Sequence, residues 1–150
     1  MFERILSVFA APEPEPLPTP DAKLALGALM VRVAKSDKVY QVSEIHRIDL
    51  LLAGLNRLKP IEAAKMRATC EKLDKQAPET SEFGRLIRET VSRADRVDAL
   101  EALWEVVLAD GVRRESELAV IAEVRKAFGL TEEDSAVARE TAERGGPTQQ

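Results

Sequence analysis

Large apolar residues recur along most of this chain at the spacing of one face of an α-helix. No segment shows the period-2 alternation, the β-branched runs or the Asn-Gly signal typical of strands and hairpins. The expected fold class is therefore all-α. The pattern predicts seven helices in the body of the chain: 24–36, 42–58, one opened by Pro60 and ended by Pro78, one capped by Thr80 or Ser81, one beginning at Asp95, 115–128, and one from Thr131 that fades before Gly145.

Some of these helices carry a further signal. Residues 24–31 are apolar on almost every side, so this helix is expected at the centre of the fold. Ser43 is the predicted N-cap of the following helix, and Thr131 with Asp134 resembles a capping box. The sequence therefore predicts one buried helix surrounded by amphipathic ones.

A different composition precedes this body. Residues 1–10 form a predicted short helix whose apolar stripe consists of Phe2, Ile5, Leu6 and Phe9. We expect the stripe to dock on the domain body or on a second subunit, and a membrane-surface or partner anchor is the alternative. Residues 11–20 contain the run PEPEPLPTP, which predicts an extended, semi-rigid linker. The helical domain then covers residues 21–143, and a disordered tail is expected at 144–150.

Composition narrows the function classes. The chain has 150 residues, of which 45% are hydrophobic, enough for one ordinary core. Its net charge is −4 and its cations are scattered, whereas nucleic-acid binding needs a clustered positive field. Cys70 is the only cysteine, so no disulfide can form within the chain, and Glu3 and Arg4 interrupt any leader-like run. A cytoplasmic protein that does not bind nucleic acid is expected.

The chain also contains an internal repeat. A shift of 73 positions aligns residues 30–51 with 103–124, and it matches Val33 to Val106, Asp37 to Asp110, Val39 to Val112, Ser43 to Ser116, Glu44 to Glu117 and Ile48 to Ile121. Each copy reads as a helix, a short loop opened by Asp, and a second helix that starts with Ser-Glu. Two antiparallel helical hairpins related by a pseudo-twofold axis are therefore predicted.

These repeats carry a family resemblance. AKSDKVYQVSEIHRIDLLL and VLADGVRRESELAVIAEVRKAFGLTEED are similar to the Asp-Gly-(five residues)-Glu hairpins of TerB-type (tellurite-resistance) proteins, over roughly residues 21–143. The first copy departs from that pattern at Lys38, where the family has glycine. The resemblance implies a compact bundle of about seven helices and a role in tellurite resistance or wider stress responses. A similar domain begins a membrane-linked DnaJ-like co-chaperone, which adds the inner face of the membrane as an alternative location.

The acidic loop residues are the candidate metal ligands. In the family such residues have been suggested as divalent-cation sites, and the resemblance carries this idea onto Asp37, Glu44, Asp110 and Glu117. Four carboxylates gathered across a pseudo-twofold axis would suit calcium or magnesium. Alternatively, each Asp accepts amide hydrogens within its turn and each Glu stabilises a helix N-terminus.

Few other residues suggest chemistry. His46 is the single histidine, expected on an outer helix face, and Cys70 and Trp104 are expected in the core. The chain has no phosphate loop, dinucleotide fingerprint, zinc spacing or HExxH motif. We therefore expect a non-enzymatic interaction or scaffold module whose acidic face meets a protein partner or an ion, with a homodimer as a further hypothesis. A metal-dependent hydrolase that uses the loop carboxylates is the alternative.

Overall fold

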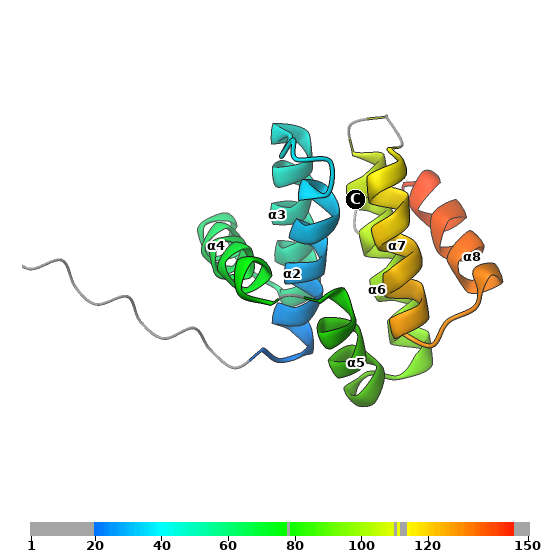
Figure 1. The fold of residues 1–150 in the computed structure, drawn as a ribbon. Helices are drawn as coiled ribbons and strands as arrows, with labels where there is room; N and C mark the ends of the chain where they lie inside the picture. Colours follow the sequence, from blue (N-terminus) through cyan, green and yellow to red (C-terminus); the bar gives the residue numbers. More distant parts are fainter. Residues whose placement is uncertain (1–19, 78, 110, 112–113, 146–150) are drawn as a thin grey trace, which may run out of the picture.

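The computed structural model describes residues 20–77, 79–109, 111 and 114–145, and all regular structure within them is helical. The all-α prediction is confirmed for this part of the chain. The predicted N-terminal helix, residues 11–19 of the predicted linker and residues 146–150 of the predicted tail lie outside the described residues. Seven helices follow one another (Figure 1): α2 (Ala22–Lys35), α3 (Val42–Asn56), α4 (Pro60–Gln76), α5 (Thr80–Thr90), α6 (Arg93–Leu108), α7 (Glu115–Ala127) and α8 (Glu132–Glu143).

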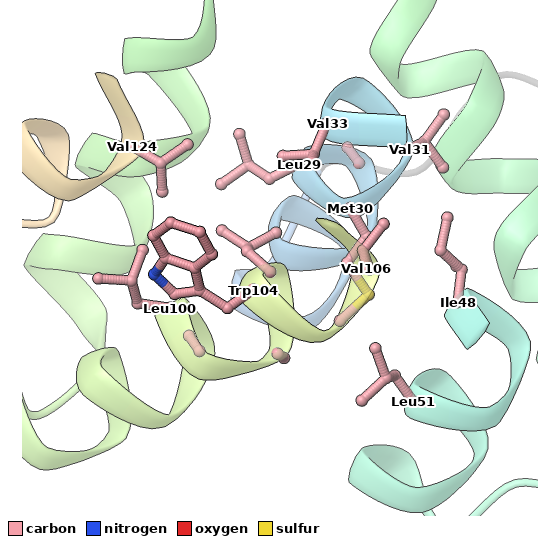
Figure 2. Close-up of a cluster of buried hydrophobic side chains, with 14 of the residues drawn as sticks. Leu29, Met30, Val31, Val33, Ile48, Leu51, Leu100, Trp104, Val106 and Val124 are labelled. Atoms are coloured by element: carbon pink, nitrogen blue, oxygen red, sulfur yellow. The ribbon is translucent and has the colours of Figure 1, made fainter. Parts of the chain in front are cut away.

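Helix α2 lies at the centre of the bundle, as its all-round apolar pattern predicts. It packs against α3, α4, α5, α6 and α7, and its residues from Gly27 to Val31 are all buried. Figure 2 shows apolar side chains of α2 close to those of α3, α6 and α7. It labels Leu29, Met30, Val31 and Val33 of α2, Ile48 and Leu51 of α3, Leu100, Trp104 and Val106 of α6, and Val124 of α7. One continuous core therefore joins both halves of the chain.

A close contact between α2 and α4 depends on a glycine. A Cβ atom added at Gly27 would lie 2.4 Å from the Sγ atom of Cys70, which is closer than such atoms approach in proteins. Cys70 is fully buried, and burial raises the pKa of its thiol to about 12. Its thiol is therefore a core group, as expected from the sequence.

An arginine of α2 closes the carboxyl end of α4. The Arg32 guanidinium forms an ion pair with Asp74, with 2.7 Å between Nε and Oδ1. Its Nη2 also donates to the main-chain oxygens of Asp74 and Ala77, at 2.8 and 2.7 Å. Carbonyls in the last turn of a helix lack partners within the helix, so Arg32 satisfies two groups that would otherwise need water. This contact between distant segments was not predicted.

Helix α6 is buried on more sides than its predicted stripe implies. Every residue from Ala99 to Val107 is buried, because α8 packs on this helix in addition to α2, α3 and α7. The buried set includes two carboxylates, Glu101 and Glu105. Burial, reinforced by repulsion from Glu105 and Asp98, raises the pKa of Glu101 to about 7.

The helix starts partly follow prediction. The capping box of α8 is confirmed, since the Asp134 amide donates to Thr131 Oγ1 at 3.1 Å and the Thr131 amide donates to Asp134 Oδ2 at 2.9 Å. The expected Ser43 cap is wrong, because α3 begins at Val42 and Gln41 is its N-cap. Ser92 caps α6, so that helix starts before the predicted Asp95. Glu79 precedes α5, so neither Thr80 nor Ser81 is its N-cap.

No helix within residues 20–77, 79–109, 111 and 114–145 has both the length and the hydropathy that a bilayer-spanning segment needs.

Candidate functional site

The two predicted hairpins turn at the same end of the bundle. Figure 1 shows the carboxyl ends of α2 and α6 beside the amino ends of α3 and α7 at this end. Arg114, the N-cap of α7, forms an ion pair there with Asp37, which follows α2, and 2.8 Å separates Arg114 Nε from Asp37 Oδ2. We call this end of the molecule the turn end. The Arg114 guanidinium thus links the turn of the first hairpin to the start of α7 in the second.

Lys38, in the turn after α2, has the same left-handed backbone as its counterpart Gly111. Lys38 has a φ of 68° and Gly111 a φ of 75°, both in the left-handed region. The Lys38 amide donates to Lys35 O at 2.9 Å, and the Gly111 amide donates to Leu108 O at 3.1 Å. Lys38 therefore shares the φ and the amide hydrogen bond of the glycine, although a side chain in this region is strained.

Asp37 stabilises its own turn as well as binding Arg114. Its Oδ1 atom accepts a hydrogen bond from the Val39 amide at 2.9 Å, the pattern of an Asx turn. The other carboxylate oxygen faces the guanidinium. One aspartate therefore fixes the loop and also attaches it to α7, so its helix-end role from the sequence analysis is present in the structure.

The two predicted glutamates are fully buried near the starts of their helices. Glu44 Oε1 accepts a hydrogen bond from the Gln41 amide at 3.2 Å, which places its carboxylate against the amino end of α3. Glu117 occupies the matching position of α7, and its Oε1 atom lies 3.6 Å from Arg114 Nε. Because both side chains are inside the protein, neither presents a negative charge directly to a partner on the surface.

The structure brings together some of the predicted metal ligands. Asp37 and Glu117 meet at Arg114, whereas Glu44 bonds to the start of its own helix. Within the described ranges, no three His, Cys, Asp or Glu side chains are close enough to hold a metal ion. Asp110, the fourth predicted ligand, lies outside those ranges. The described residues thus do not form a metal site, and the four-carboxylate site stays a prediction.

Arg114 is the residue that the sequence analysis did not identify. Under the shift of 73 positions it corresponds to Gln41, so a cation replaces a neutral residue at one of two equivalent helix starts. That difference between the copies was a readable signal.

The turn end also carries exposed apolar side chains. Val39 is 48% exposed and Val42 is 80% exposed, on either side of the N-cap of α3. His46, one turn further along α3, is exposed as predicted. The turn end thus combines two exposed valines with an ion pair that joins the two turns.

Comparison with known proteins supports the resemblance seen in the repeats. The sequence model of the family described as "Tellurite resistance protein TerB" matches residues 23–140, which includes all seven helices except parts of the first and the last. Neither the curated proteins nor the solved structures include a match to this chain.

Proposed function

Because the chain belongs to the family of the tellurite resistance protein TerB, we propose that it is a non-enzymatic binding module in tellurite or general stress resistance. The turn end is its proposed binding surface. The partner is a protein that places an apolar side chain against Val39 and Val42. The observation that supports this proposal most strongly is the exposure of Val39 and Val42 next to a turn that Asp37 attaches to Arg114.

The ion pair matters because it reduces the cost of binding. A loop that must become ordered when its partner arrives loses conformational entropy, and a loop already held in place loses less. Asp37 is bonded within its turn and to the opposite hairpin, so Val39 and Val42 are presented on a backbone with little freedom left. Apolar side chains surrounded by polar ones are also the usual composition of a protein interface.

The test is binding by the full chain with matched surface variants. Val42→Asp changes the proposed surface, and Ile61→Asp changes another exposed apolar residue at the start of α4. Proteins that the native chain captures from cell extract are identified, and the protein recovered in the largest amount is purified for a direct affinity measurement. We expect Val42→Asp to raise the dissociation constant of the complex with this protein at least about tenfold, corresponding to about 1.4 kcal/mol, and Ile61→Asp to leave it unchanged.

Two results would count against this function. One is equal binding by both variants and the native chain. The other is growth on tellurite, in cells whose resistance depends on this protein, that the Val42→Asp variant supports as well as the native chain does.

Divalent-cation binding by Asp37, Glu44, Asp110 and Glu117 remains a separate proposal. Its support is the matching placement of these four acidic residues in the two repeats. Because Arg114 pairs with Asp37 and Glu117, a bound cation would have to displace this guanidinium. Carboxylate oxygens are the ligands that calcium and magnesium prefer. The unfolding experiment in the Discussion tests it.

A further inference from the structure

An apolar groove lies at the end of the bundle opposite the turn end. Its volume is about 290 Å³, and α2, α3, α5 and α6 form its walls. The apolar lining residues are Ala22, Leu26, Leu52, Leu55, Ile87, Val91 and Ala99. Lys23 and Asp95 are charged, exposed residues at its edge. A space of this size takes one or two large side chains, and its lining favours apolar ones.

The chain itself contains a segment of matching chemistry. Residues 1–10 carry a predicted helical stripe that needs an apolar surface to cover it: Phe2, Ile5, Leu6 and Phe9. Glu3 and Arg4 provide one negative and one positive charge beside the stripe, and the groove edge offers Lys23 and Asp95. Apolar character and charge therefore suit this segment as the occupant, with one or two of its four large side chains inside the groove and the others on its rim.

The linker between the N-terminal stripe and the groove determines whether the stripe can reach the groove of its own chain or that of a second copy. Residues 11–20 have proline at every second position, and a residue before proline is kept out of the helical region, so the sequence predicts no turn there. At about 3.1 Å per residue, the predicted extended conformation of these ten residues would span about 31 Å. The groove begins at Ala22, directly after this linker. A stiff linker carries the stripe away from the groove at its own base.

We propose that residues 2–9 of one copy occupy the groove of a second copy, and that two chains exchange these segments reciprocally to form a symmetric dimer. Each chain then contributes one stripe and one groove, so the contact closes on itself and does not propagate into a filament. The surface involved is separate from the turn end, which both copies keep free for a partner.

The test uses the full chain and two variants that affect opposite sides of the contact. Leu6→Asp changes the stripe, and Leu55→Arg changes the groove at a side chain that is 43% exposed, so the core is left intact. Ile61→Asp, on an exposed residue outside the groove, is the control. Light scattering gives the mass of each form, and circular dichroism verifies that each is folded.

We expect the native chain and the control to have twice the 16.6 kDa chain mass, and each of the two variants alone to have the mass of one chain. A mixture of the two variants should form a mixed dimer, because the stripe of the Leu55→Arg chain fits the groove of the Leu6→Asp chain. The mixed dimer should dissociate at least about tenfold more readily than the native one, because it has one contact in place of two.

Three outcomes would overturn the proposal. A native chain that stays single at its highest soluble concentration would exclude exchange. Dimers that survive both variants would place the interface elsewhere. A single native chain that binds lipid vesicles through Leu6 would make the N-terminal segment a membrane anchor.

Discussion

Replacing Arg114 with glutamine should destabilise the fold by removing the positive charge between the two hairpins. The variant gives the second hairpin the residue that the first has at the equivalent position, Gln41. It removes the guanidinium that lies 2.8 Å from Asp37 and 3.6 Å from Glu117, whose side chain is 1% exposed. A buried carboxylate then loses a nearby opposite charge, while its own desolvation is unchanged.

The size of the effect follows from partial burial. Loss of one member of a fully buried pair costs about 3–5 kcal/mol, and an exposed pair contributes about 0.2–1 kcal/mol. The Arg114 side chain is 33% exposed, so solvent screens part of the interaction. We therefore expect the free energy of unfolding to fall by about 2 kcal/mol, which lowers Tm by roughly 4–8 °C in a domain of this size.

Urea unfolding followed by far-ultraviolet circular dichroism measures this change. Arg114→Lys retains the charge and should lose less stability than Arg114→Gln. Arg144→Gln breaks an exposed ion pair with Glu140 and should change the free energy of unfolding by less than about 0.5 kcal/mol. If Arg114→Gln has no larger effect than Arg144→Gln, the argument that this cation stabilises the joined turns is refuted.

Three further predictions concern the core and the acidic loops. Glu101→Gln should raise Tm more at about pH 8 than at about pH 5, because burial and neighbouring carboxylates raise the pKa of Glu101 from 4.5 to about 7 in the folded state. Between these two pKa values the folded state holds a proton that the unfolded state has released, so the free energy of unfolding falls as pH rises over this range. Equal effects at the two pH values, measured by thermal unfolding, would contradict this. Gly27→Ala should lower the free energy of unfolding by about 1–3 kcal/mol, because the added methyl group crowds Cys70. The double variant with Cys70→Ala should lose less stability than the sum of the two single variants, and additive losses would exclude the clash. If the loops bind calcium or magnesium, saturation to about 100 times the dissociation constant should stabilise the native chain by about 2.7 kcal/mol, and an Asp37→Asn, Asp110→Asn double variant should lose this gain; identical melting curves with and without ion would leave these carboxylates as turn and cap residues.

The helices could be predicted from the sequence because their apolar spacing is a local property. The central position of α2 followed from its apolar residues on every side, and burial from Gly27 to Val31 confirms it. Helix starts were less predictable. Ser43 is of a residue type preferred at N-caps, yet α3 starts at Val42 with Gln41 as its N-cap. With this start, the Glu44 side chain accepts a hydrogen bond from the Gln41 amide. Several residues near a helix start can supply a cap, and composition does not choose among them.

The candidate site could be predicted only in part. The repeat paired Asp37 with Asp110 and Glu44 with Glu117, and the structure places Asp37, Glu44 and Glu117 beside helix ends. Arg114 was missed because its partner Asp37 lies in the other hairpin, and the periodicity of one helix contains no information about which distant residue it faces. The contact of Arg32 with the end of α4 was missed for the same reason. The burial of α6 on nearly every side likewise depends on α8, which packs on this helix and which the sequence of α6 alone does not predict.

The central position of α2 has a consequence for the order of folding during synthesis. This helix is made first among those described, but α6 and α7, which cover part of it, begin only at Arg93 and Glu115. At a synthesis rate of about 5–20 residues per second, several seconds pass between the synthesis of α2 and that of the helices that cover its apolar side chains. The nascent first half thus exposes a surface that chaperones bind. Nascent chains stalled before α6 should be sensitive to protease, and those with α7 outside the ribosome should be resistant; equal resistance at both lengths would show that the first half folds without the second.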